Sequence, residues 1–164
     1  MKKIIIIGLA GIISMTSAAA QNRKKQIYID YSGKPGVSAV CISPAMFKLM
    51  GQLPDINVET ADGKKMDMAP LVRSFSGFYM LSFEKMSAAS AELYKEVTSM
   101  VNKGGFELLM EVKDDGSTIR MYTLGDEKVV NSFVCIINEE DETMFFSLEG
   151  SMNRSDIEKL IAGM

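Results

Sequence analysis

The sequence contains no histidine and no tryptophan, only two cysteines and four prolines, and its net charge is −3. The missing histidine removes the usual acid/base group at neutral pH and the commonest metal ligand, so many hydrolase and metalloenzyme designs are closed to this chain. The net negative charge leaves no excess of basic residues for phosphate binding, so we expect no nucleic-acid partner. No Cys-x-x-Cys pair occurs, which argues against a thiol redox enzyme.

The composition is that of a folded globular protein. Hydrophobic residues make up 47% of the chain and charged residues 24%, well away from the composition of disordered chains. The length of 164 residues is enough for one domain with its own core. We therefore expect one folded domain, and not a fibre, a membrane bundle or a two-domain enzyme.

Residues 1–20 have the features of a secretory signal peptide. Two lysines open the segment, a mainly apolar stretch follows at 4–13, and three alanines at 18–20 supply the small side chains that a signal peptidase reads. The apolar stretch falls short of the roughly 20 residues of a transmembrane helix, and no cysteine near the cleavage site offers a lipid attachment point. We therefore predict cleavage before Gln21. The mature protein is then periplasmic or extracellular, soluble, and without a transmembrane segment.

After the leader we expect a short arm and then one domain. Residues 21–36 begin polar and basic and then contain two glycines and a proline, which predicts a flexible N-terminal arm. Residues 37–164 are expected to form a single α+β domain. Within it, residues 52–66 show no clear period and are long for a connection, so they are either a functional loop or a mobile one, and mobility is favoured.

Short elements alternate in the first half of that domain. The expected elements are a strand at 37–42, a helix from Ser43 to Gly51, a helix at 68–75, a strand at 78–83 and a helix from Ser87 to Lys103. The last of these is the clearest, because Ser87 suits an N-cap and apolar residues then recur at intervals of three and four.

The second half changes to strand periodicity. Four strands are expected at 106–113, 118–124, 128–138 and 143–149, followed by a C-terminal helix. Their connections are short, which requires antiparallel neighbours, and Asp115-Gly116 is a strong hairpin signal. The third strand is apolar on both faces and is therefore expected to be central. The predicted fold is α+β: an antiparallel sheet made of this four-stranded meander plus one or two earlier strands, with helices packed on one face.

The two cysteines lie in predicted strands. Cys41 and Cys135 could form a disulfide in an oxidising compartment. Alternatively, they are two separate buried thiols that behave as small hydrophobic residues.

Methionine is unusually frequent, with 14 residues. Met46 and Met50 are spaced by one helical turn, and Met66 and Met68 flank a single residue, so their thioethers could hold Cu(I) outside the cytoplasm. The alternative is that methionine fills irregular cores and adaptable surfaces. No other metal site and no cofactor is predicted.

Paired carboxylates are the remaining route to catalysis. Glu107 and Glu111 share one face of a predicted strand, but at roughly 3.3 Å per residue they lie about 13 Å apart, beyond the separation that glycosidases use. No serine-nucleophile pattern occurs either, so no catalytic residue is predicted.

Several segments together resemble the bacterial family called domain of unknown function 4252. The similarity covers roughly Val40 to the C-terminus and is carried by the run Phe78 to Glu84, the helix after Ser87, the segment Gly105 to Gly116 and the block Cys135 to Gly150. The resemblance implies a small exported protein, often a lipoprotein, with no established activity. This chain differs from the lipoprotein members because Gln21 follows the predicted cleavage site.

These observations favour a non-enzymatic exported domain of the bacterial envelope. We expect it to bind an envelope protein or a small apolar ligand, through its exposed sheet face or the methionine-bearing first segment. Two alternatives stay open: a periplasmic Cu(I)-binding protein that uses the four methionines, and a hydrolase that uses an unrecognised carboxylate pair.

Overall fold

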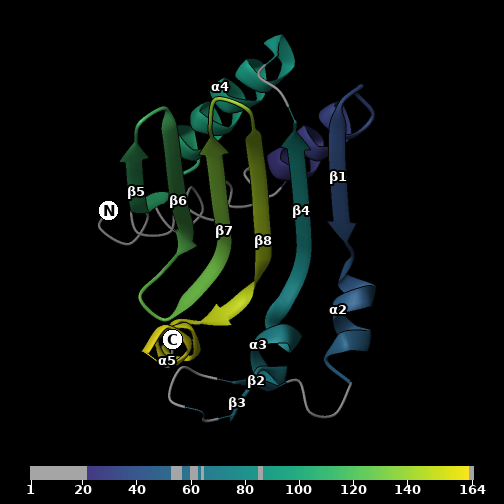
Figure 1. Ribbon diagram of the computed structural model, residues 1–164. Coiled ribbons are helices and arrows are strands. Elements are labelled where there is room, and N and C mark those ends of the chain that lie inside the picture. Colours follow the sequence, from purple (N-terminus) through teal and green to yellow (C-terminus); the bar gives the residue numbers. More distant parts are fainter. Residues whose placement is uncertain (1–21, 53–56, 60–62, 64, 85–86, 163–164) are drawn as a thin grey trace, which may run out of the picture.

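The protein is built around one antiparallel sheet (Figure 1). The computed structural model describes residues 22–52, 57–59, 63, 65–84 and 87–162. The sheet has six strands in the order β1-β4-β8-β7-β6-β5. These are β1 (Val37–Ile42), β4 (Phe75–Phe83), β5 (Glu107–Asp114), β6 (Ser117–Gly125), β7 (Val129–Asn138) and β8 (Thr143–Asn153). The predicted α+β class and the four-stranded C-terminal meander are confirmed, with β1 and β4 as the two earlier strands.

The meander begins with a tight hairpin between β5 and β6. Asp114 pairs with Ser117 across the Asp115-Gly116 turn, and Gly116 has a φ of 79°, the left-handed conformation that a tight hairpin requires. Further along the same hairpin the register shifts between Leu108 and Met110, so Leu109 is an extra residue in β5. Such a bulge bends the strand and increases its twist.

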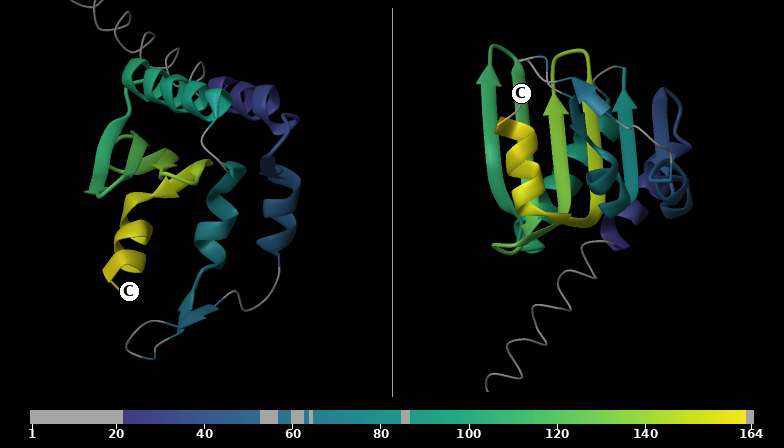
Figure 2. Two further views of the ribbon diagram at one scale, coloured as in Figure 1. Left: turned by 45° about the horizontal axis from the view of Figure 1, so that its top comes forward. Right: turned by 90° about the horizontal axis from the view of Figure 1, so that it is seen from below.

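Two helical segments cover one face of the sheet. They are α4 (Ala88–Lys103) and a helix of residues 22–32, and Figure 2 shows both on the same side. Ser87 begins α4 with a capping box in which its hydroxyl accepts from the Ser90 N–H and the Ser90 hydroxyl accepts from the Ser87 N–H. The core lies between these helices and the sheet, and contains Ile27, Tyr31, Leu81, Phe83, Leu93, Val97, Val101, Tyr122, Val134, Ile136 and Phe145.

The expectation of a flexible arm at residues 21–36 is wrong for most of that segment. Residues 22–32 form a helix, and the side chains of Lys24 and Ile27 are both 0% exposed. The Tyr31 hydroxyl donates to Glu96 of α4 at 2.9 Å, and Arg23 also pairs with Glu96. The helix is held because one of its stripes belongs to the core, while the glycines and proline that suggested an arm come only after its last turn.

Part of the segment 52–66 is also more regular than expected. It contains β2 (Asn57–Glu59), which pairs with β3 (Lys65–Asp67) as a two-stranded antiparallel ribbon. Gly63 lies between them with a φ of 77°. Residues 53–56, 60–62 and 64 lie outside the described part of the chain.

Three shorter helices lie on the opposite face of the sheet. There α3 (Ala69–Ser74) and α5 (Arg154–Ala162) contact β8, beside α2 (Pro44–Met50), which contacts α3 and β4 (Figures 1 and 2). Phe47 of α2 packs edge-on against Phe75, with ring centroids 5.4 Å apart. In the part of the chain that the structure describes, no helix is both long enough and apolar enough to cross a membrane.

Candidate functional site

An apolar groove lies on the sheet face opposite α4. It has a volume of about 500 Å³ and is walled by α3, α5 and strands β5 to β8. Figure 1 looks onto this face, with α3 and α5 at the lower end of the sheet. The lining consists of Met68, Leu71, Phe75, Leu109, Met121, Thr123, Val130, Phe133, Phe146, Leu148, Met152, Arg154, Ile157 and Glu158. A concave, mainly apolar surface with a few polar groups is the usual form of a small-molecule site.

The floor of the groove follows from the two-sided apolar pattern of β7. Val134 and Ile136 are buried in the core on one side, while Phe133 lines the groove on the other. Phe133 lies opposite Leu148 of β8, so the two side chains share the groove face. The prediction that this strand is apolar on both faces and central is confirmed, and the groove is the reason for its second apolar face.

One wall of the groove depends on a close backbone approach at Gly150. A Cβ atom at this position would lie 2.4 Å from the carbonyl oxygen of Ser74, the last residue of α3. A Cβ atom at that distance would clash with the backbone of α3, which cannot move aside easily. Glycine is therefore needed for α3 and the start of β4 to approach β8. This approach places Phe75 at the edge of the groove.

The charges around the groove do not form an anion site. Arg154 is at one end, where its Nε and Nη2 donate to the carbonyl oxygen of Asp126 at 3.2 and 2.9 Å. Glu158 lines the same groove, and a neighbouring depression that shares Arg154 is lined by Glu107, Asp126 and Glu127. Acidic groups therefore outnumber the single arginine, and they oppose the entry of an anionic head group.

A buried ion pair joins the helix of residues 22–32 to the sheet. Lys24 Nζ is 2.6 Å from Glu149 Oε1 and donates to Ser132 Oγ at 2.6 Å, while Ser132 Oγ donates to Glu149 Oε1 at 3.1 Å. Burial lowers the pKa of Lys24 and raises the pKa of Glu149, and the attraction between the two groups opposes both shifts. Glu149 Oε2 has no hydrogen-bond partner in the described part of the protein.

Perturbed pKa values also occur in catalytic sites, but the surroundings of this pair favour a structural role. Lys24 is 0% exposed and Glu149 is 7% exposed. Neither residue lines the groove or either of the two surface depressions on the described residues. A substrate would have no access to the amine, so the pair fixes the position of the helix.

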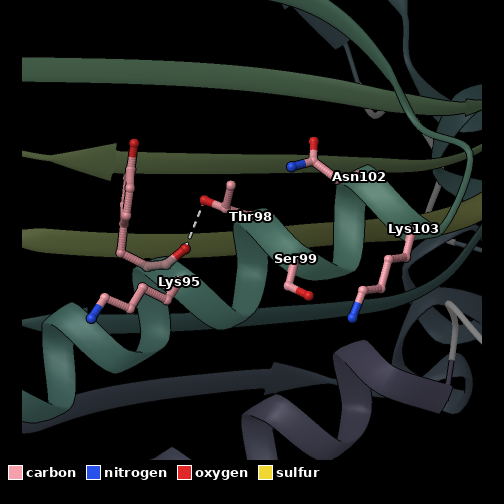
Figure 3. A pocket seen from close by; sticks show the side chains of 6 residues that line it. Lys95, Thr98, Ser99, Asn102 and Lys103 are labelled. Atoms are coloured by element: carbon pink, nitrogen blue, oxygen red, sulfur yellow. Dashed lines mark hydrogen bonds between the residues drawn. The ribbon is translucent and has the colours of Figure 1, made fainter.

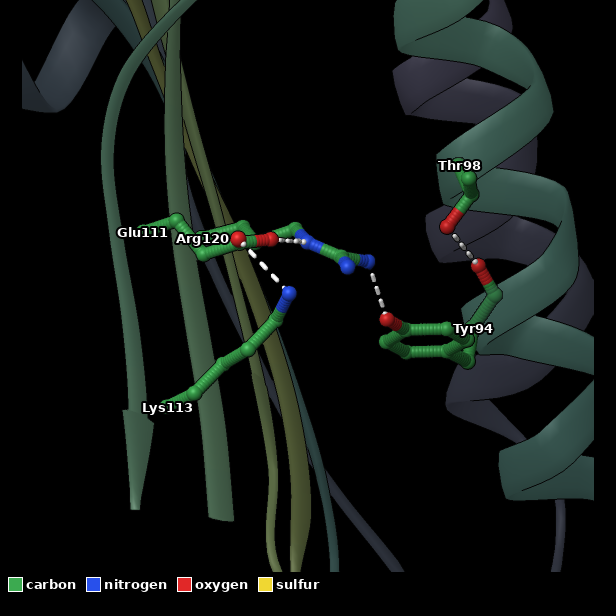
Figure 4. A network of polar contacts seen from close by, with 5 residues as sticks. All are labelled: Tyr94, Thr98, Glu111, Lys113 and Arg120. Atoms are coloured by element: carbon green, nitrogen blue, oxygen red, sulfur yellow. Dashed lines mark hydrogen bonds and ion pairs between the residues drawn. The ribbon is translucent and has the colours of Figure 1, made fainter.

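A second polar network links β5, β6 and α4 at the surface (Figure 4). Arg120 Nε donates to Glu111 Oε2 at 2.5 Å, and the same guanidinium donates to the Tyr94 hydroxyl of α4. Lys113 Nζ lies 2.9 Å from Glu111 Oε1. Hydrogen bonds from Lys113 and Arg120 lower the pKa of Glu111. This carboxylate is held ionised and paired, the opposite of what a general acid requires.

A shallow depression of about 400 Å³ lies on the outside of α4 (Figure 3). It is lined by Tyr94, Lys95, Thr98, Ser99, Asn102 and Lys103, all of them from this one helix. The Thr98 hydroxyl donates to the Tyr94 carbonyl of its own helix at 2.8 Å. Because no second element of the described chain supplies an opposing wall, the depression by itself does not enclose a ligand.

Three of the four candidate copper ligands have described side chains, and they come from two different parts of the structure. Met46 and Met50 lie on α2, where Met46 is 50% exposed, whereas Met68 lines the groove. Met66 belongs to β3, and its side chain is outside the described part of the structure. Among the described residues, no group of three or more acidic or cysteine side chains is placed to hold a metal ion. The structure thus gives Met68 a place in the groove wall, and copper binding stays a prediction.

The possible disulfide between Cys41 and Cys135 is contradicted by the sheet. Both cysteines are free, Cys41 exposed on β1 and Cys135 buried on β7. Strands β4 and β8 lie between β1 and β7, so three strand spacings separate the cysteines, about 14 Å. A disulfide requires Cα atoms less than about 7 Å apart. The two apolar sequence contexts indicated strands, but they carried no information on strand order.

We predict that the two thiols differ greatly in reactivity. Cys41 should be alkylated rapidly in the native protein, whereas Cys135 should react only after unfolding, because burial both shields its thiol and raises its pKa. Mass spectrometry after timed iodoacetamide treatment, with and without denaturant, measures this directly. Equal labelling of both thiols in the native protein, or a mass gain of two hydrogens on reduction, would contradict the assigned strand order.

Analysis of the sequence missed the groove as a site and the buried ion pair. The signals for the groove were the two-sided pattern of β7 and the apolar stripe of the C-terminal helix that contains Ile157. For the ion pair, the signal was the spacing of Lys24 with Ile27 and Tyr31, which is that of one helical face. Nothing in the sequence pairs Lys24 with Glu149.

Comparison with known proteins gives a family without an assigned activity. Residues 31–160 match the family described as Domain of unknown function (DUF4252). No curated protein matches the chain.

Proposed function

Since the chain belongs to the DUF4252 family, whose description assigns no activity, we propose from its groove that it is a non-enzymatic exported domain that binds an uncharged apolar ligand. The observation that carries this proposal is a groove of about 500 Å³ with a mainly apolar lining. This volume is within the range of roughly 300 to 1,000 Å³ that is usual for ligand sites.

The shape of the site favours a small ligand over a flat protein contact. The helices α3 and α5 stand on the sheet face as walls, and β7 and β8 supply aromatic and aliphatic side chains as the floor. Burial of an acyl chain on such a surface is favoured by about 0.8 kcal/mol for each methylene group. A hydrocarbon chain therefore suits the site.

The charged side chains around the groove favour an uncharged ligand. The guanidinium of Arg154 is engaged by the Asp126 carbonyl, and Glu158 lines the same groove. A fatty-acid carboxylate would meet these acidic neighbours without a dedicated partner. A neutral head group such as glycerol can instead exchange hydrogen bonds with Glu158 and with Nη1 of Arg154, which does not bond to the Asp126 carbonyl.

The bacterial envelope is the proposed place of action. Residues 1–20 have the pattern of a cleavable signal peptide, and cleavage before Gln21 would retain Lys24 and Ile27, both of which belong to the folded core. N-terminal sequencing of the protein recovered from the periplasm should therefore begin at Gln21. A protein recovered from the cytoplasm with residues 1–20 attached would refute this part of the proposal.

Ligand binding can be tested with the neutral dye Nile red. We expect the purified protein to raise the dye's fluorescence, and a neutral monoacylglycerol to displace the dye better than the corresponding fatty acid. The substitution Phe133→Glu places a charge in the groove and should weaken dye binding roughly tenfold or more, because desolvating a charge is costly. Val40→Glu is the matched control, since Val40 is 40% exposed on an outer strand of the same sheet face, outside the groove.

Two outcomes would count against the groove as the site. The first is no dye binding by the folded protein, and the second is an equal loss in the two variants. If the dye does not bind while a crosslinker captures one envelope protein on this face, the protein-partner alternative replaces the ligand.

A further inference from the structure

The last strand of the sheet is an open edge. Among the strands that the structure describes, β5 has only β6 as a neighbour, and each of its residues from Glu107 to Asp114 is exposed. Its apolar side chains Leu108, Leu109, Met110 and Val112 are 43–53% exposed. An edge of this kind offers unpaired N–H and C=O groups to another strand.

The hairpin geometry identifies which backbone groups are unpaired. Asp114 and Ser117 flank the two-residue turn and are paired in register, and the residues that flank such a turn form a hydrogen-bonded pair, so the backbone groups of Asp114 face β6. The orientation alternates along a strand, so Val112 also faces β6, whereas Lys113 and Glu111 direct their N–H and C=O groups to the open edge.

These two outward residues restrict how a second β5 could pair by two-fold symmetry. Lys113 opposite Lys113, or Glu111 opposite Glu111, places like charges in direct contact, which is unfavourable. Only the register with Glu111 opposite Lys113 of the second copy pairs opposite charges, and symmetry makes this contact twice. In the same register Val112 lies opposite Val112 of the second copy.

The bulge in β5 does not obstruct this register. Leu109 is the extra residue, and the paired stretch would run from Met110 to Asp114. Glu111 and Lys113 also share one face of the sheet, where they already form an ion pair 2.9 Å long. In the paired arrangement Glu111 of each copy lies opposite Lys113 of the other copy, with no change in the backbone of β5.

We propose that β5 pairs with β5 of a second copy of this chain, in antiparallel orientation and with Glu111 opposite Lys113, so that the two sheets join into one. The contact combines four backbone hydrogen bonds, two ion pairs and the Val112 contact at the symmetry axis. It is independent of the groove, and failure of either proposal leaves the other standing.

Charge reversal tests this register. Sedimentation velocity of the purified protein over a wide concentration range should show a monomer–dimer equilibrium. Either Glu111→Lys or Lys113→Glu alone should weaken the dimer about tenfold or more, because each turns two attractive contacts into two repulsive ones. The double variant Glu111→Lys/Lys113→Glu restores opposite charges and should recover most of the affinity.

The double variant also separates the dimer contact from the contact of Glu111 with Arg120, whereas the Glu111–Lys113 pair within each chain is restored along with the dimer contact. Glu111 pairs with Arg120 within the chain, so any loss due to that contact persists in the double variant, whereas a loss at the dimer contact is reversed. Circular dichroism should show all three variants folded. The proposal is overturned if the unmodified protein is monomeric at every concentration, or if a dimer forms that the single variants do not weaken or the double variant does not restore.

Discussion

Replacement of Lys24 by methionine should lower the free energy of unfolding by about 3 to 5 kcal/mol, because it leaves the Glu149 carboxylate buried without a cation. Glu149 is 7% exposed, and its second oxygen already has no hydrogen-bond partner among the described residues. Loss of Lys24 would leave the first oxygen with the hydrogen bond from the Ser132 hydroxyl. Urea unfolding followed by circular dichroism measures the effect.

The loss of stability in the Lys24→Met variant should depend on pH. Burial raises the pKa of Glu149 in the folded protein above its ordinary value of 4.5, and loss of Lys24 removes an interaction that lowers it. A raised folded-state pKa means that the group favours folding below the unfolded pKa, and that this stability is lost as pH rises through the folded pKa. The difference in free energy of unfolding between the variant and the unmodified protein should therefore be smallest at acid pH and largest at neutral pH.

The double variant Lys24→Met/Glu149→Met is the matched control. It removes both charges and keeps similar side-chain volume, and replacement of a buried ion pair by apolar residues is often neutral or stabilising. We expect it to recover most of the lost stability. A Lys24→Met variant as stable as the unmodified protein, or a double variant no better than the single one, would contradict a buried ion pair at this position.

The second large effect is expected at Ile27, on the same helix. Its side chain is 0% exposed and packs in the core, so Ile27→Ala should cost about 2 to 5 kcal/mol. Ile29, two residues further, is 54% exposed, so Ile29→Ala should change stability by no more than about 0.5 kcal/mol.

This pair isolates the docking of the helix, because residue type, helix and substitution are identical and only burial differs. Thermal and urea unfolding of the two variants provide the comparison. Equal and small effects would mean that residues 22–32 are a loosely attached arm, as the sequence alone suggested, and not a part of the core.

The helix of residues 22–32 shows why composition misled the sequence analysis. Lys24, Ile27, Tyr28 and Tyr31 recur at the spacing of one helical face, but the first of them is charged and the segment around it is polar. A lysine is rarely fully buried, so it is normally assigned to the solvent side. Its tertiary partners Glu149 and Ser132, both far along the chain, make its burial tolerable.

The C-terminal meander was predictable because its information is local. The Asp115-Gly116 turn, the short connections and the two-sided apolar pattern of β7 each act over a few residues, and together they fix the order β5-β6-β7-β8. The position of β1 and β4 at the other edge is set by long-range pairing of β4 with β8. That pairing separates Cys41 from Cys135, and no local pattern encodes it.

The groove could not be predicted from the sequence for the same reason. Its walls come from α3 and α5, short helices that lie far apart in the sequence, and the approach of α3 depends on the absence of a side chain at Gly150. The sequence indicated an apolar surface on β7, but not which elements would stand beside it.

The most direct test of the account is chemical-shift mapping with a neutral monoacylglycerol. Amide spectra of the isotope-labelled protein, recorded during the titration, should show saturable shifts concentrated at Leu71, Phe133, Leu148 and Ile157, with little change along α4. A spectrum that does not change, or shifts that concentrate on α4 and the helix of residues 22–32, would show that the groove is not the binding site.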